Sequence, residues 1–347
     1  MEPMSLSVPQ TTDSKEPRRD VVAPGTLYEV LPDGRWAFYF DSHMIGTFSD
    51  CETKFKLAYR DNLRLRGERN FSTSVGSWWS AAMSDFYEFM AAGSLTLARA
   101  LESAGHHWAK LKMQDFQATS PKKYEAFGGY NGALLMVSQY YTAQADTDQQ
   151  GWKIIATEAG FGRKKEVLVG ENHQVVVYLI GVPDLIIFAQ NRLMPVDHKT
   201  RDRIDYDVQS RWKPHSQTAG YIYATNILAK ELGYDVVVDR CIINVAARLE
   251  PTDKPRDGVK KPRFTRAYPN YSQEELAEWR QQKMEQATRL RYCIESDMFT
   301  RNEYTCHLYS GCAYRPVCSV KPSSRSVVIK ANYEVVKAWV PYELGDE

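Results

Sequence analysis

The sequence predicts an α/β fold in which helices flank a mixed central sheet. Apolar residues recur at helical spacing between residues 42 and 144. Between residues 152 and 199 they form short runs typical of strands, and after residue 213 the helical spacing returns. This order of helices, strands, helix, strand and helix is typical of an α/β domain. An apolar fraction of 43% and an aromatic fraction of 12% supply the core that such a domain needs.

We expect three parts along the chain. Residues 1–22 are rich in Ser, Thr, Pro and charged residues, which predicts a disordered N-terminal arm. Residues 23–320 are expected to form a single domain, with a helical insertion at about 74–145 and a cysteine-bearing region at about 300–320. Residues 321–347 follow as a C-terminal extension.

Five helical segments are expected. Residues 42–66 carry apolar side chains at helical spacing on either side of Cys51. Residues 74–104 give a strong helical pattern, and residues 128–144 give another. The later helices are 213–231, which Gly233 ends, and 272–293, which Ser272 opens as an N-cap.

The strands are expected between these helices. Five closely spaced runs predict consecutive strands in a meander, at 152–158, 165–169, 173–181, 184–188 and 192–199. Residues 235–247 are apolar and β-branched, so they predict a further core strand. Cys241 in that strand is expected to be an ordinary buried cysteine.

The overall composition and net charge do not indicate a particular binding partner. The net charge is +1, so any electrostatic footprint for nucleic acid must be local. We find no signal peptide and no segment that is long and apolar enough to span a membrane, which predicts a cytoplasmic protein without membrane contact. In that reducing compartment the six cysteines are not expected to form a disulfide framework.

The candidate catalytic residues lie at the ends of a predicted hairpin. Asp184 begins the run 184–188, and Asp197 and Lys199 close the run 192–199. Asp197 and Lys199 are two residues apart, so on a strand they point to the same face. Because buried acids without partners are costly, this pattern favours a divalent cation and metal-assisted hydrolysis. The alternative is an ordinary salt bridge at a sheet end.

A helix after the hairpin narrows this interpretation. Gln217 and Tyr221 are four residues apart, so they share one helix face. The chain therefore carries three short motifs in order: Gly181-x-x-Asp184, Asp197-x-Lys199 and Gln217-x-x-x-Tyr221. Together they resemble the PD-(D/E)XK nuclease superfamily, and more narrowly its RecB-like exonuclease branch. The resemblance implies a restriction-endonuclease-like sheet and a metal-dependent DNA exonuclease.

The resemblance also implies a role for each motif residue. Asp184 and Asp197 are expected to bind Mg²⁺ or Mn²⁺, with the backbone carbonyl of His198 as a further ligand. Lys199 is expected to orient or activate the attacking water. The motif pair on the helix, Gln217 and Tyr221, is expected to support the site or contact DNA.

Two further positions bear on the metal. Glu158 lies at the end of the run 152–158, where the resemblance often supplies a glutamate near the metal; the alternative is a solvent-facing acid. The family also commonly carries a Gly-x-x-x-His pattern on a helix before the sheet. Here Gly76 is followed by Ser80 at the histidine position, so that ligand is absent or supplied by another residue such as Asp85.

The expected substrate is DNA with free ends or single strands. The resemblance suggests recombination, repair or phage- or CRISPR-linked DNA processing in a prokaryotic or phage-infected cytosol, with a helicase or recombination protein as partner. A second hypothesis keeps the fold without the catalysis, as a DNA-binding or scaffolding subunit.

The cysteines give a second signal. Cys306, Cys312 and Cys318 are separated by two five-residue gaps, and Cys51 lies far upstream. One early and three late cysteines are similar to the iron-sulfur exonucleases of this branch, which include CRISPR-associated exonucleases and the nuclease domain of the AddB subunit. That resemblance implies a [4Fe-4S] cluster on these four thiolates. The alternatives are zinc, in a zinc-stabilised endonuclease, and reduced core thiols.

Basic residues near the hairpin are candidates for contact with DNA. Arg211 follows the hairpin, and Lys261, Arg263 and Arg266 lie in a predicted Pro-, Lys- and Arg-rich loop at 250–268. Mixed charge and aromatic rings suit single-stranded nucleic acid. The alternative is a solvated loop with incidental charge.

Overall fold

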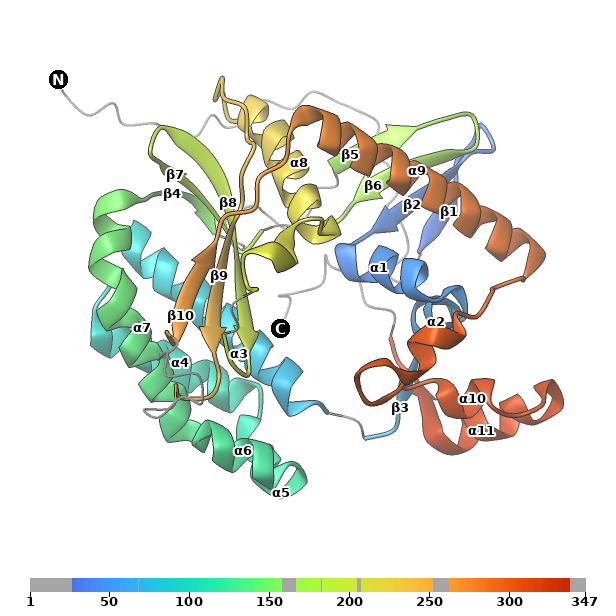
Figure 1. Ribbon diagram of the computed structural model, residues 1–347, viewed down its shortest axis with the longest axis horizontal. Coiled ribbons are helices and arrows are strands. Elements are labelled where there is room, and N and C mark those ends of the chain that lie inside the picture. The colour runs from blue at the N-terminus through green and yellow to red at the C-terminus, as the bar shows by residue number, and fades with distance from the viewer. Residues whose placement is uncertain are drawn as a thin grey trace.

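The computed structural model describes residues 27–67, 69–157, 167–181, 183–204, 207–251 and 262–337. The chain forms two main sheets with helices packed around them, so the mixed α/β class predicted from the sequence is confirmed (Figure 1). The predicted N-terminal arm at 1–22 lies outside the described residues. In the described part of the chain, no helix has the length and apolar character needed to cross a membrane.

A five-stranded sheet contains the predicted hairpin. Its order is β10 (Phe264–Ala267), β9 (Ile242–Ala247), β8 (Arg192–Arg201), β7 (Leu185–Ala189) and β4 (Lys153–Thr157). β8 and β9 run parallel, and the other neighbours are antiparallel. Gln190 and Asn191 join β7 to β8 at φ values of 50° and 59°, as a two-residue hairpin turn of mirror-image type requires.

A second, four-stranded sheet corrects the predicted meander. Its order is β1 (Tyr28–Val30), β2 (Trp36–Phe40), β6 (Val175–Leu179) and β5 (Val167–Glu171), with β2 parallel to β6. β6 therefore pairs with the N-terminal strand β2 on one edge and with β5 on the other, and both β5 and β6 leave the hairpin sheet. β6 is almost entirely buried, so it needs partners on both edges, and distant β2 supplies one of them. Such long-range pairing is invisible to local periodicity.

Helices cover both faces of the five-stranded sheet. On one side lie α3 (Phe71–Ala91), α4 (Leu97–Lys110) and α7 (Gly129–Gly151), and on the other lies α8 (Ser216–Glu231) (Figure 1). The predicted helix 74–104 is thus two helices. Gly93 at φ +63° allows the chain to turn between them.

The segments around Cys51 and the second sheet form the other half of the molecule. α1 (Ser42–Asp50) and α2 (Glu52–Phe55) flank Cys51, and a π-helical turn at Lys56–Arg60 follows. α9 (Gln273–Ser296) packs against β5 and β6. Its first turn is closed by a capping box between Ser272 and Glu275, as the sequence predicts for the N-cap.

A small C-terminal unit packs beside Cys51. It consists of a 3-10 segment (Glu303–Ser310), α10 (Arg315–Cys318), α11 (Arg325–Asn332) and β11 (Tyr333–Val335). β11 pairs with β3 (Leu63–Leu65). Leu57, Leu63, Tyr314, Val317 and Tyr333 build a core of their own here, which links the two chain regions.

Helix α9 buries a lysine, and this gives a prediction about stability. Lys283 is 7% exposed, and its Nζ donates a hydrogen bond to Gln286 at 2.8 Å. Burial lowers the pKa of Lys283 from 10.5 to about 8. Between those values the unfolded chain binds the additional proton, so raising the pH across this range stabilises the fold.

We therefore expect Lys283→Met to raise the free energy of unfolding by on the order of 1 kcal/mol at pH 7, because the buried charge is removed. The gain should shrink by about pH 10, where the native lysine is already neutral. Thermal unfolding at the two pH values measures both effects. A gain of the same size at both would assign it to packing instead of charge.

Candidate active site

The sheet end brings two carboxylates and one lysine together. Asp197 and Lys199 share one face of β8, and Lys199 Nζ lies 2.9 Å from Oδ1 and 2.7 Å from Oδ2 of Asp197. Asp184 precedes β7, and its Oδ2 accepts a hydrogen bond from the backbone N–H of His198 at 2.6 Å. The hairpin therefore assembles this group from residues that are close in sequence.

Burial sets the charges of the group. Burial raises the pKa values of Asp184 and Asp197, and attraction to Lys199 opposes that rise. Burial alone would lower the pKa of Lys199, but the two carboxylates outweigh it and leave this pKa above its usual value. The lysine thus stays protonated. Its side chain is 27% exposed, so the ammonium group remains reachable by a substrate.

One oxygen of Asp197 has the character of a metal ligand. Asp197 is 1% exposed, and its Oδ2 has no hydrogen bond within the described residues, although the ion pair with Lys199 lies beside it. The Lys199 ammonium group, 2.7 Å from this oxygen, compensates its buried charge. Carboxylate and carbonyl oxygens are the ligands that Mg²⁺ and Mn²⁺ prefer, so the residues present fit such an ion.

The side chains alone do not complete a coordination sphere. Among the described residues, no three His, Cys, Asp or Glu side chains gather closely enough to hold a metal. Further ligands at this sheet end would come from the His198 carbonyl, from water, from a substrate or from residues outside the described part of the chain. Glu158, the predicted additional acid, lies outside the described residues.

Helix α8 closes the site from one face of the sheet. Gln217 Nε2 donates a hydrogen bond to the Tyr221 hydroxyl at 2.8 Å. Burial raises the pKa of Tyr221, and the charges of Asp197 and Asp184 add to the rise. The phenol therefore stays neutral beside the acids, and the pair lies where the sequence motif predicts.

The side chain of His198 points away from this group. Its ring stacks on Tyr87 with centroids 5.3 Å apart and planes 15° apart, and its Nδ1 lies 3.0 Å from Asn244 Nδ2. Burial lowers the pKa of His198 to about 3, so the imidazole is neutral. The backbone N–H of His198 therefore contacts Asp184, whereas its side chain packs against Tyr87.

Comparison with models of known protein families identifies the family of this chain. The family model of the PD-(D/E)XK nuclease superfamily matches residues 44–319 of the 347. The chain belongs to the PD-(D/E)XK nuclease superfamily. The mixed sheet flanked by helices is consistent with the restriction-endonuclease-like fold of this superfamily, and the function at this level is that of a nuclease acting on DNA. Among curated proteins, none matches the sequence.

Ser80 contacts one of the two acids of this PD-(D/E)XK site. Its Oγ lies 3.3 Å from Asp184 Oδ1, so α3 reaches the site at the position where many relatives carry a histidine. Asp85 does not replace that histidine, because its Oδ2 bonds Ser103 Oγ at 2.6 Å and pairs with His107 Nε2 at 3.0 Å.

Ser80 gives a prediction about metal affinity. We expect Ser80→Ala to weaken Mn²⁺ binding roughly fivefold, because a hydrogen bond of about 1 kcal/mol that orients Asp184 is lost. Ser80→His should tighten binding, since it adds an imidazole ligand beside the carboxylates. Titration of free Mn²⁺ by electron paramagnetic resonance measures both variants. Unchanged affinity in both would remove Ser80 from the site.

Sequence reasoning missed two residues near the acids. Cys241 comes directly before β9, and the charges of Asp197, Lys199 and Asp184 all act on its thiol, whose pKa burial raises well above its usual value. Its place could have been found from the parallel pairing of β8 with β9. His215 precedes the helix that carries Gln217, and its buried Nδ1 has no hydrogen-bond partner in the described chain.

The predicted DNA-binding arginines are engaged within the fold. Arg263 is 7% exposed and pairs with Glu250, and Arg266 forms an ion pair with Asp148 at 2.7 Å. Both lie at strand β10, not in a solvated loop, because the apolar Phe264 and Ala267 make that segment an edge strand. Arg211 is exposed and bonds Asp207 at 2.6 Å. Lys261 lies outside the described residues. We therefore assign no DNA contact to these three arginines or to this lysine.

The four cysteines of the predicted cluster lie in one region. Burial raises the pKa of Cys318, the charge of Arg301 opposes that rise, and the neighbouring thiols of Cys312, Cys306 and Cys51 add to it. The backbone N–H of Asn302 donates to Cys51 Sγ at 3.5 Å, so the segment before Cys306 lies against Cys51. Among the described residues, no three of these cysteines lie close enough together to hold a metal ion. The four are neighbours, but their thiols are not arranged as a complete set of metal ligands.

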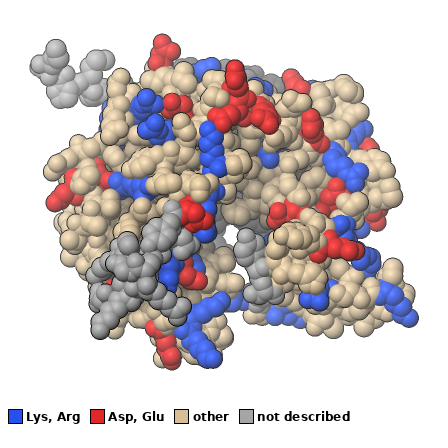
Figure 2. Space-filling view, viewed as in Figure 1, with Lys and Arg blue, Asp and Glu red and all other residues tan. Residues whose placement is uncertain are grey.

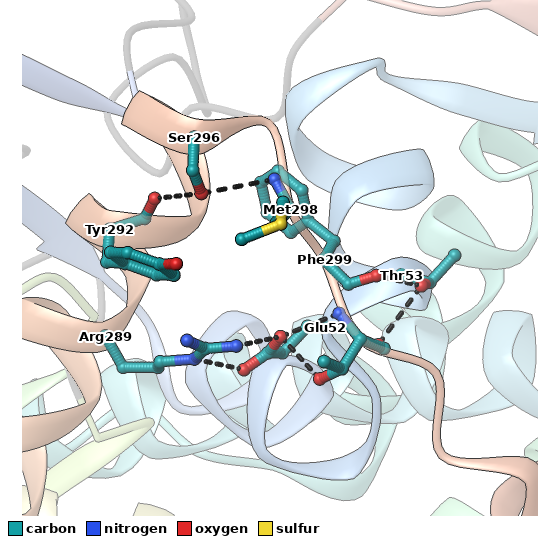
Figure 3. A network of polar contacts seen from close by, with 8 residues as sticks. Glu52, Thr53, Arg289, Tyr292, Ser296, Met298 and Phe299 are labelled. Atoms are coloured by element: carbon teal, nitrogen blue, oxygen red, sulfur yellow. Dashed lines mark hydrogen bonds and ion pairs between the residues drawn. The ribbon is translucent and has the colours of Figure 1, made fainter.

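A polar network holds Cys51 beside the late cysteines. Glu52 accepts two hydrogen bonds from Arg289, at 2.8 and 3.1 Å, and two more from Thr300 (Figure 3). Thr53 Oγ1 donates to the carbonyl of Phe299. Burial would raise the pKa of Glu52, but these bonds lower it to about 2. This network fixes α2 to the segment that follows α9.

Proposed function

We propose that the protein is a divalent-metal-dependent DNA exonuclease. The observation that carries the proposal is the meeting of Asp184, Asp197 and Lys199 at one sheet end, where the Asp197 carboxylate is buried against the Lys199 ammonium group. Asp184, Asp197 and the His198 carbonyl would hold Mg²⁺ or Mn²⁺. Such a cation supplies charge to polarise a phosphodiester and to lower the pKa of a water.

The other residues act through their own charges and hydrogen bonds. Lys199 keeps its proton beside the two carboxylates, so it would donate hydrogen bonds to the attacking water or to a phosphate oxygen. Asp197 holds the lysine in place by their ion pair. Gln217 and the neutral Tyr221 close the α8 side and limit the access of bulk water to the acids.

The choice of an exonuclease rests on the resemblance to the RecB-like branch. We infer that DNA ends or single strands are the substrate, in the cytoplasm, and that recombination or repair is the setting. Linear DNA labelled at one end and closed circular DNA, each incubated with Mn²⁺, separate the options. An exonuclease degrades the linear DNA alone, whereas cleavage of the circle at the same rate would contradict the proposal.

We further propose that Cys51, Cys306, Cys312 and Cys318 hold a [4Fe-4S] cluster. The supporting observation is that one early thiol and three late thiols share one region beside the polar network of Glu52. Four cysteines suit zinc as well, so the metal must be identified. Protein purified without oxygen should be brown, and colourless protein with stoichiometric zinc would replace the cluster by zinc.

A second candidate function has one specific observation in its favour. Ser80 stands where the superfamily commonly carries a histidine, so the site has fewer side-chain ligands. A DNA-binding subunit without catalysis would bind end-labelled DNA yet leave it intact with Mn²⁺ and Mg²⁺. Hydrolysis that a chelator stops would exclude this candidate.

A further inference from the structure

The C-terminal extension and the segment it pairs with carry a local positive charge. Residues 56–67 and 320–337, here called the C-terminal basic module, contain eight Lys and Arg against two Asp and Glu. The module therefore has a net charge of +6, whereas the whole chain has +1. Figure 2 shows Lys and Arg at several points of the surface around α10 and α11.

Strand pairing and a buried tyrosine hold the two segments of the module together. β11 pairs with β3 in the register Tyr333 to Leu65, and the backbone N–H of Arg66 donates to the carbonyl of Asn332 at 3.0 Å. Tyr333 is 2% exposed, and its hydroxyl donates to the carbonyl of Ala313 at 2.6 Å. α11 and β11 lie beyond residue 319, where the match to the superfamily ends, so family membership assigns them no role.

Two exposed lysines of the module have no acidic partner among the described residues. Lys56 and Arg60 pair with Asp297 at the end of α9. Lys321 and Lys330 are exposed, and neither forms an ion pair with a carboxylate in the described part of the chain. They are therefore available to an anionic partner.

A pocket at the base of the module adds a second site of positive charge. It has a volume of about 280 Å³, and its lining includes Arg301, Arg325 and Lys56 together with Asp61 and Asp297. The Nε of Arg325 is buried there and has no hydrogen-bond partner among the described residues.

We propose that the C-terminal basic module binds the phosphate backbone of double-stranded DNA outside the hydrolytic site. The proposal rests on the nuclease function above and adds a second contact with the substrate. Its charge complements phosphates. Single-strand binding needs exposed rings for stacking, yet of the two aromatic residues of the module Tyr333 is buried and Tyr59 packs against the ring of Phe55. The module therefore suits a duplex, held while its end reaches the acids.

The test measures binding without hydrolysis, so that it is independent of catalysis. Full-length wild type, Lys321→Gln/Lys330→Gln and the control Lys153→Gln/Lys230→Gln are titrated with fluorescent blunt duplex and with a single strand, in a chelator and over several salt concentrations. The control removes two exposed lysines from β4 and α8, away from the module.

We expect the module variant to bind the duplex roughly tenfold more weakly at low salt, with a salt slope smaller by about 2, because two phosphate contacts are lost. Single-strand affinity and the control should stay at wild-type values. Duplex affinity equal to wild type would overturn the proposal, as would the same loss on the single strand or in the control. Failure to hydrolyse any DNA, with the expected binding result, would sink the nuclease proposal and leave the module standing.

Discussion

Replacing Asp197 by Asn is expected to reduce DNA hydrolysis at least about a thousandfold, since roughly 4 kcal/mol of transition-state stabilisation depends on the charge that this carboxylate gives to a divalent cation. Asparagine keeps the shape of the side chain but not its charge. Initial rates on end-labelled linear DNA with Mn²⁺ measure the effect, and circular dichroism checks that the fold remains.

A matched control is Asp146→Asn, an exposed acid on α7. It should retain the wild-type rate. If Asp197→Asn retained the rate as well, the hydrolytic site would lie elsewhere. Lys199→Gln should lose hydrolysis with little change in DNA binding, because its ammonium group acts on the reacting groups.

Replacing Cys51 by Ser is expected to remove the brown colour and to destabilise the protein by roughly 5 kcal/mol, by analogy with a cross-link that closes a long loop. The reason is that Cys51 ties α2 to the segment of Cys306, far along the chain. Absorbance near ~400 nm, typical of iron-sulfur clusters in general, and thermal unfolding measure the two effects.

Cys293→Ala is the control for this variant, because Cys293 is a buried thiol of α9 outside the set of four. It should keep the colour and lose only the stability that comes from packing. Wild-type colour and stability in Cys51→Ser would contradict the cluster. If Cys51→Ser kept the brown colour but lost stability, the ligands of the cluster would be other residues.

The parts of the fold that depend on local pattern were predictable. Two apolar runs on either side of a short turn predict the hairpin, and the hairpin alone brings Asp184 to Asp197. The spacing of Gln217 and Tyr221 likewise defines one face of α8. Local period and spacing are sufficient here, because the residues that meet are near each other in sequence.

The parts that depend on distant pairing were not predictable. β6 leaves the meander because β2, from the N-terminal region, pairs with it in parallel. Cys241 joins the site only through the pairing of β9 with β8. Arg263 was expected to lie in a loop, but it directly precedes edge strand β10, is buried and pairs with Glu250. In each case the decisive neighbour lies far away in sequence.

One measurement tests the central claim most directly. Wild-type protein is incubated with linear duplex DNA labelled at one end, with Mn²⁺ in one sample and excess chelator in the other, and Asp197→Asn is run beside it. The account predicts short labelled products from the wild type with Mn²⁺ and intact DNA in both other samples. Products that form in the chelator, or from Asp197→Asn at the wild-type rate, would contradict a metal-dependent site at Asp184 and Asp197.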